Sequence, residues 1–149
     1  MPTKTKSVDD NYVRMYYEHQ YERIGKQEES RLTITNYVIT LSALAFTFGY
    51  QNVVQLTVIN GIGLPLIILI ANLFAIAYIN RTKDFINAHR ARALEILERY
   101  APVLKEINEL HRWRKGRFLL GRGHVQIGIH WLLILTALIP ASLYLYQIL

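Results

Sequence analysis

The chain has 149 residues, with 17 lysine and arginine residues against 11 aspartate and glutamate residues, so its formal net charge is +6. It contains no cysteine, which excludes disulfide frameworks, cysteine-ligated zinc or iron–sulfur sites and thiol nucleophiles. The charges are confined to two stretches, because residues 32–80 and 123–149 contain no Asp, Glu, Lys or Arg. Such long charge-free runs favour a hydrocarbon environment, where a charge at the centre of a span costs about 3 kcal/mol.

The N-terminal arm, residues 1–31, holds six basic and six acidic groups and is predicted to be a cytoplasmic helix. Ser7-Val-Asp-Asp10 matches a helix-capping pattern, and acids in a first turn are favoured by the helix dipole. One long helix is expected over residues 8–49. Tyrosines gather on one side of the arm, and packing against another helix or subunit is expected there rather than stacking on nucleic acid; this assembly surface comprises Tyr16, Tyr17 and Tyr21.

The charge-free runs predict three membrane spans. Residues 32–80 are too long for one span, and the segment 50–63 carries polar residues and an Asn60-Gly61 turn pair, so a short external loop is expected there. Each span offers close to the ~20 residues that cross a bilayer core of ~30 Å as a helix. The predicted spans are residues 33–49, 64–79 and 127–149. A soluble bundle with buried helices is the alternative, but apolar residues all round a helix leave it no wet face.

The expected fold class is therefore all-α, an integral membrane protein with three transmembrane helices, a long N-terminal helix and a helical cytoplasmic hairpin. All 17 Lys and Arg residues lie in the arm and in residues 81–122. The positive-inside rule then places the N-terminus and this hairpin in the cytoplasm and the C-terminus outside the inner membrane. The predicted segments are residues 1–31 (arm), 32–80 (spans one and two with their loop), 81–122 (hairpin) and 123–149 (span three).

The hairpin carries an apolar stripe with helical spacing, which Pro102 is expected to interrupt; the stripe comprises Ile86, Ala93, Leu97, Tyr100, Leu104 and Ile107. A second helix is predicted from about residue 102 to 114, and glycines at 116, 121 and 123 are expected to turn the chain back to the membrane. A basic run over residues 111–122 overlaps the end of that helix and is expected to contact anionic lipid headgroups, at about 1 kcal/mol per charge, with nucleic acid as the rival partner. Its cations are Arg112, Arg114, Lys115, Arg117 and Arg122.

Polar residues inside the spans are candidates for a functional site. Asn36, Thr40 and Thr47 fall on one face of span one, Asn72 lies in the middle of span two, and His130 lies in span three. Polar groups within a membrane usually face other helices or water. Two interpretations stay open: these residues hydrogen-bond the helices together, or the face of span one lines a pore built from several subunits.

Catalytic and cofactor motifs are not found in the sequence, so no enzyme activity, metal or cofactor is expected. The five histidines lack ligand spacing, and no P-loop or nucleophile elbow is present. Arg14-x4-His19 and Arg117-x6-His124 formally match the Arg-x(4–6)-His pattern of HEPN-type RNases, but chance predicts about one such match in this chain. A membrane-bound RNase of that type is the least favoured alternative.

The segments YYEHQYERIGKQEESRLTITNYVITLSALAFTF and INRTKDFINAHRARALEILERYAPVL resemble small membrane proteins encoded beside prokaryotic antiviral systems. The resemblance is to SLATT-type membrane effectors and to membrane accessory proteins of RNA-targeting CRISPR loci, in the layout of charged helix, tight spans and helical cytoplasmic part. It implies a homo-oligomeric effector of abortive infection that forms a pore or perturbs the bilayer when a trigger reaches its cytoplasmic face. The alternative is a non-conducting membrane anchor for a soluble partner.

Overall fold

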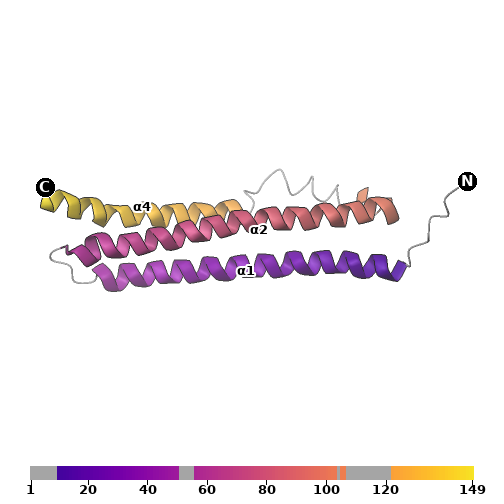
Figure 1. The fold of residues 1–149 in the computed structure, drawn as a ribbon, viewed down its shortest axis with the longest axis horizontal. Helices are drawn as coiled ribbons and strands as arrows, with labels where there is room; N and C mark the ends of the chain where they lie inside the picture. The colour runs from indigo at the N-terminus through magenta and orange to yellow at the C-terminus, as the bar shows by residue number, and fades with distance from the viewer. Residues whose placement is uncertain (1–9, 51–55, 104, 107–121) are drawn as a thin grey trace, which may run out of the picture. The chain divides into compact units, whose positions relative to one another are not determined.

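The structure is a computed structural model that describes residues 10–50, 56–103, 105–106 and 122–149. Within these ranges the regular structure is helical throughout, and Figure 1 labels its main elements. The all-α class is thus confirmed for the described chain, and three of its helices are long and apolar enough to cross a membrane. The elements are α1 (Asp10–Tyr50), the π-helix η1 (Ile59–Gly63), α2 (Leu64–Tyr100) and α4 (Arg122–Ile148).

Helix α1 agrees with the single helix predicted over residues 8–49. Its N-terminal half contains no proline, and side chains one turn apart pair along its surface. Lys26 Nζ lies 2.6 Å from Glu22 Oε1, and Arg23 Nε donates to His19 Nε2 at 2.8 Å. The predicted cap at Ser7 lies outside the described residues. The charge-free part of α1, residues 32–50, is about 28 Å long at the α-helical rise, enough for the hydrocarbon core of a bilayer.

The turn predicted at Asn60-Gly61 is wrong, because these two residues belong to η1, which runs directly into α2. The chain is helical from Val58 onward. Asn60 serves as a capping residue instead: its Oδ1 accepts from the Thr57 backbone N–H at 2.5 Å, and its own N–H donates to Thr57 Oγ1 at 3.5 Å. This reciprocal pair satisfies donors at the helix start, as a capping box does.

Helix α2 ends at Tyr100, which confirms the interruption predicted at Pro102. The residue before a proline is disfavoured in the α conformation, and Ala101 is accordingly not helical. Residues 102–103 and 105–106 are helical again, whereas the rest of the predicted second helix lies outside the described residues. Gly123, expected in a turn, instead lies in the first turn of α4.

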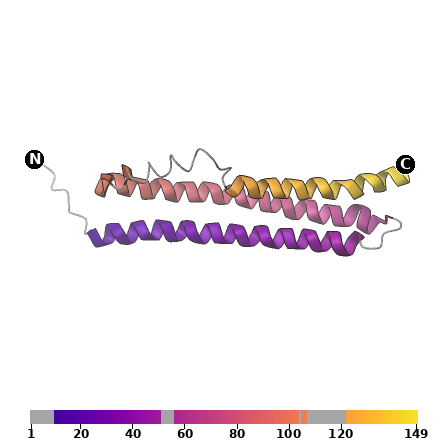
Figure 2. The ribbon, with the colours of Figure 1, turned by 180° about the vertical axis from the view of Figure 1, so that it is seen from behind.

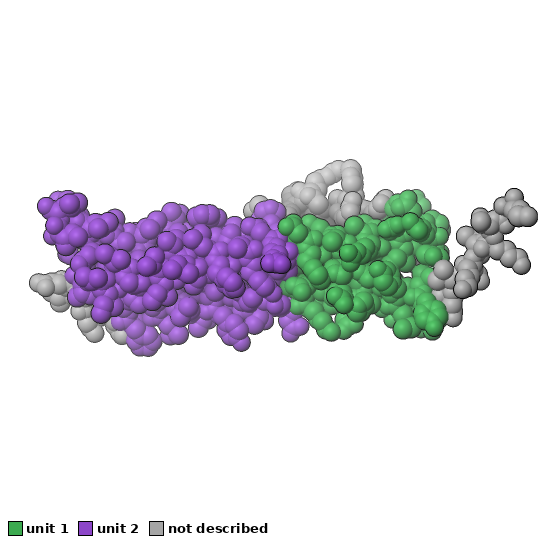
Figure 3. Space-filling view, viewed as in Figure 1, with its two compact units in different colours: residues 1–28, 84–119 green, residues 29–83, 120–149 purple. Residues whose placement is uncertain are grey.

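The chain divides into two compact units, drawn in different colours in Figure 3. Unit 1 comprises Met1–Glu28 and Asp84–Leu119, and unit 2 comprises Glu29–Lys83 and Leu120–Leu149. The boundaries at residues 28, 83 and 119 each lie three residues from the charge boundaries at 31, 80 and 122. Contacts and charges therefore divide the chain at nearly the same places.

In unit 2, α2 lies between α1 and α4 in both ribbon views (Figures 1 and 2). Its buried positions alternate at spacings of three and four residues, the pattern of helices that pack with a small left-handed crossing angle. Several side chains at the contacts are small, with Ser42 and Ala75 fully buried and Ala137 1% exposed, which lets helices approach closely. The buried positions of α2 here are Pro65, Ile68, Asn72, Ala75, Ile79 and Thr82.

The outside of unit 2 is more apolar than its inside. Tyr37, Phe48 and Phe74 are 72%, 74% and 61% exposed, while Ser42, Asn72 and His130 are 0% exposed. A water-soluble bundle has the opposite distribution, with apolar side chains inside and few large apolar patches outside. An apolar outside of this kind is typical of helices that contact lipid.

A close contact at one end of unit 2 gives a test of this packing. A Cβ atom on Gly61 would lie 2.5 Å from Cγ of Tyr144 in α4, whereas a Cβ on Gly63 would meet nothing closer than 3.9 Å. We expect Gly61→Ala to destabilise the protein in detergent by about 1–3 kcal/mol through overpacking. Gly63→Ala, its matched control in the same π-helix, should be neutral or slightly stabilising. Thermal unfolding followed by circular dichroism measures both, and equal unfolding temperatures would contradict the Gly61–Tyr144 contact.

Candidate membrane-embedded polar site

A hydrogen-bond network of three polar side chains lies inside unit 2. Ser42 belongs to α1, Asn72 to α2 and His130 to α4, and all three are 0% exposed. They are separated by 30 and 58 residues in sequence, so the tertiary fold alone brings them together. The structure thereby joins the predicted site residues Asn72 and His130 and adds Ser42 to them.

The amide of Asn72 uses all of its hydrogen-bonding atoms. Its Nδ2 donates to Ser42 Oγ at 3.0 Å and to the Ile68 carbonyl at 2.8 Å, while its Oδ1 accepts from His130 Nδ1 at 2.7 Å. Since Oδ1 is an acceptor, the proton of this contact lies on Nδ1 of the imidazole. One asparagine therefore links all three helices of unit 2.

Hydrogen bonds of this kind hold helices together where there is no water to compete. Between transmembrane helices they contribute about 0.6–2 kcal/mol each, and an unsatisfied amide in hydrocarbon costs more. Nε2 of His130 is buried and has no hydrogen-bond partner in the described part of the chain. The imidazole is therefore anchored on one side and unpaired on the other.

The predicted polar face of α1 does not contribute to this network. Asn36, Thr40 and Thr47 are all exposed on the surface of unit 2. At 3.6 residues per turn these three fall within an arc of about 40°. That polar sector lies roughly 150° around the helix from the positions that α1 buries. The buried positions of α1 in this unit are Arg31, Thr35, Val38 and Ser42.

Four large apolar side chains of α1 form a second exposed sector in unit 2. It lies roughly 90° from the polar sector and suits contact with lipid. Its side chains are 46–74% exposed: Tyr37, Leu41, Leu44 and Phe48. Helix α1 thus has three kinds of surface in unit 2, one packed on neighbouring helices, one apolar and one polar.

In unit 1 the predicted assembly tyrosines differ in their surroundings. Tyr16 and Tyr21 are 51% and 43% exposed, whereas Tyr17 is half-buried with its ring centroid 5.0 Å from that of Tyr21. Burial and a hydrogen bond with Tyr21 raise the pKa of Tyr17 to about 12. The predicted apolar stripe of the hairpin is buried at Ile86, Ala93 and Leu97 but not at Tyr100, which is 52% exposed.

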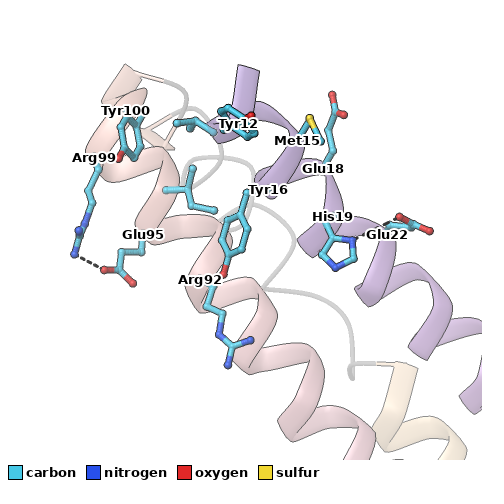
Figure 4. Close-up of a pocket in the computed structure, with 12 residues that line it drawn as sticks. Tyr12, Met15, Tyr16, Glu18, His19, Glu22, Arg92, Glu95, Arg99 and Tyr100 are labelled. Atoms are coloured by element: carbon cyan, nitrogen blue, oxygen red, sulfur yellow. Dashed lines mark hydrogen bonds and ion pairs between the residues drawn. The ribbon is translucent and has the colours of Figure 1, made fainter. Parts of the chain in front are cut away.

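A groove of about 920 Å³ opens between α1 and α2 in unit 1. Tyr16 extends from α1 toward α2 within it, and Arg92 lies on the facing helix (Figure 4). The lining mixes aromatic side chains with charges of both signs, and the Arg99–Glu95 ion pair lies at its margin. The arm and the first helix of the hairpin therefore present a recessed, amphipathic surface.

Helices α1 and α2 are also joined in unit 1 by a buried polar pair. His89 is 4% exposed and Gln20 2%, and Nδ1 of His89 donates to Oε1 of Gln20 at 2.6 Å. Burial lowers the pKa of His89, and the positive charges of Arg92 and Arg23 and the side chain of His19 lower it further. His89 is therefore neutral at physiological pH and serves as a structural hydrogen-bond donor.

Other predicted residues lie apart from these sites or outside the described chain. Four cations of the predicted lipid-binding run lie outside the described residues: Arg112, Arg114, Lys115 and Arg117. The fifth, Arg122, begins α4, but its side chain is not described. Of the two histidines in the RNase-type patterns, His19 bonds to Arg23 on its own helix, and His124 lies in unit 2 with its Nε2 3.4 Å from Lys83 Nζ.

Sequence reasoning missed Ser42, Gln20 and His89 as interhelical contacts. A periodic signal was present, because Arg31, Thr35, Val38 and Ser42 follow a spacing of four, three and four residues. This stripe has the same period as the more polar stripe at residues 36, 40 and 47. Periodicity alone does not tell which stripe packs against neighbouring helices.

Comparisons of the chain with protein-family models, with curated proteins and with solved structures find no match. The functional argument therefore starts from the arrangement of the polar residues themselves.

The contribution of this hydrogen-bond network to the stability of the protein can be measured by replacing its central residue, Asn72. Asn72→Leu leaves His130 and Ser42 without partners and should lower stability in detergent by about 1–2 kcal/mol. Asn80→Leu is the matched control, because Asn80 is exposed on the same helix. The expected outcome is a lower thermal unfolding temperature for the first variant only. An equal effect of both changes would show that the buried network does not stabilise the three helices.

Proposed function

We propose that the protein is an oligomeric membrane protein whose α1 helices line a water-filled pore through their polar sector, Asn36, Thr40 and Thr47. The observation that carries the proposal is that these three side chains are exposed and take no part in the hydrogen bonds that join the helices within the subunit. Hydrogen bonding within one subunit is supplied by Ser42, Asn72 and His130. The polar sector is therefore not needed to hold the subunit's own helices together.

A polar sector that faced lipid would be unfavourable, because hydroxyl and amide groups lose hydrogen bonds to water there. Contact with water in a pore removes this cost. Three helices are too few to enclose a channel, so several subunits arranged around an axis are required. The apolar sector of α1, about a quarter turn away, then faces lipid or a neighbouring subunit.

Conduction without coupling to protons fits the composition of the spans. Residues 32–80 and 123–149 contain no Asp, Glu, Lys or Arg, so the carboxylates that commonly carry protons within membranes are missing there. Threonine hydroxyls and an asparagine amide form a neutral polar lining, so the pore is expected to discriminate weakly between ions.

The charge distribution supports an orientation with unit 1 in the cytoplasm. All 17 Lys and Arg residues belong to the arm and to residues 81–122, and the segment between the first two spans has none. The positive-inside rule then places the N-terminus inside and the C-terminus outside the inner membrane. The groove of unit 1, with Tyr16 and Arg92, is in this orientation the surface that a cytoplasmic trigger would reach.

A role in antiviral defence is supported by the resemblance of the arm and first span to small membrane effectors encoded beside prokaryotic defence systems. In this role the pore stays closed until an infection cue binds the cytoplasmic unit, and its opening depolarises the infected cell. The groove favours a second candidate, a membrane anchor that recruits a soluble protein without conducting. Stoichiometric capture of such a protein, without toxicity on overexpression, would favour the anchor.

Liposome leakage tests the pore directly. Purified protein reconstituted with an encapsulated fluorescent dye should release it, and Thr40→Leu should slow the release about tenfold because an apolar constriction promotes dewetting. Leu44→Phe is the matched control, since it adds similar bulk in the apolar sector of the same helix. Dye retention by a confirmed oligomer would contradict the pore, and equal slowing by both changes would contradict the assignment of the polar sector.

A further inference from the structure

A second feature of unit 2 is a buried arginine without a counter-charge. Arg31 in α1 is only 7% exposed, and its Nε atom is buried without a hydrogen-bond partner among the described residues. No ion pair found in the described chain includes Arg31. Burying a guanidinium in this way is costly unless an anion accompanies it.

The side chain of Arg31 points to the first turn of α4. A Cβ atom on Gly123 would lie 3.4 Å from Nη1 of Arg31 and 2.9 Å from Cε of Lys83 in α2. Both cationic side chains therefore pass over the same glycine, which leaves room for them. Nζ of Lys83 also lies 3.4 Å from Nε2 of His124, the next residue of α4.

The backbone at this position adds to the positive potential. The first four N–H groups of a helix have no partner within the helix, and the dipole of the 27-residue α4 places partial positive charge at Arg122–His124. Helix N-termini combined with basic side chains are established phosphate-binding arrangements. One turn beyond Arg31, the Thr35 hydroxyl is buried without a partner among the described residues and can donate to an anion.

We propose that Arg31, Lys83 and the N-terminal turn of α4 bind a phosphate group, and that this is the phosphate of an anionic phospholipid headgroup. Arg31 is the last charged residue before the charge-free run that starts at Leu32. Lys83 follows the end of that run, and Gly123 begins the other. All three therefore lie at the ends of the candidate spans, at the level of headgroup phosphates. The proposal rests on the proposed membrane insertion but not on a pore.

The site differs from the basic run at residues 112–122, which would attract headgroups as a diffuse charge. Here a planar guanidinium can donate two parallel hydrogen bonds to phosphate oxygens, while the ammonium contributes a point charge. A bound lipid would bridge α1, α2 and α4 where they leave the membrane. It would thus stabilise the end of unit 2 that is connected to the cytoplasmic part.

Binding is tested on the full chain in a non-ionic detergent with dihexanoyl-phosphatidylglycerol, a short-chain lipid, as the probe. The lipid should raise the unfolding temperature. Its affinity should fall at least about tenfold in Arg31→Gln and in Lys83→Gln, because each change removes a charge-assisted contact. Arg81→Gln is the matched control, since Arg81 is an exposed cation on the same helix as Lys83. If Arg31→Gln does not fold, the affinity of Lys83→Gln for the lipid still tests the site.

Parallel arms identify the source of the phosphate. Inorganic phosphate that binds as tightly as the lipid would overturn the lipid assignment, and equal losses in all three variants would overturn the site. Dye leakage is measured on the same variants in phosphatidylcholine vesicles. Loss of lipid affinity with unchanged leakage supports a site independent of the pore, whereas lipid binding by a protein that never leaks would refute the pore alone.

Discussion

The rest of the structure depends on the requirement that polar groups among apolar helices find partners inside the protein. Asn72 meets this requirement by bonding to Ser42, to His130 and to the Ile68 carbonyl. Because these bonds are buried among apolar side chains, where no water competes for donors and acceptors, they fix which faces of α1, α2 and α4 meet. The small residues beside them, such as Ala75 and Ala137, let the helices approach closely enough for the bonds to form.

Once those faces are fixed, the other residues of α1 acquire distinct roles. The stripe that ends at Ser42 is buried, the stripe that includes Tyr37 and Phe48 is apolar and exposed, and the stripe that includes Thr40 is polar and exposed. A helix that packs against its neighbours and otherwise contacts lipid needs only the buried stripe and the apolar exposed stripe. The third kind is the reason for proposing a water-filled assembly, and the buried Arg31 beside Gly123 is a separate reason for proposing a bound phosphate.

The sequence predicted the helices well and their contacts poorly, for physical reasons. Charge-free runs and the break at Pro102 are local signals, so the three long helices and the end of α2 at Tyr100 were predictable. The turn expected at Asn60-Gly61 failed because a side-chain cap to Thr57 and contact with Tyr144 override the local preference of this pair. Ser42 and His89 were missed because their partners lie 30 and 69 residues away, and periodicity does not identify partners.

The central claim is that water reaches the Thr40 side of α1. The chain has no cysteine, so single cysteines can be introduced without removing any. In liposomes, a water-soluble methanethiosulfonate reagent should modify cysteines at positions 36, 40 and 47 rapidly, because only hydrated thiols ionise and react. Cysteines at positions 37, 41, 44 and 48 should react slowly. Equal, slow reaction at all seven positions would contradict a water-filled pore and leave the polar sector as a contact between subunits.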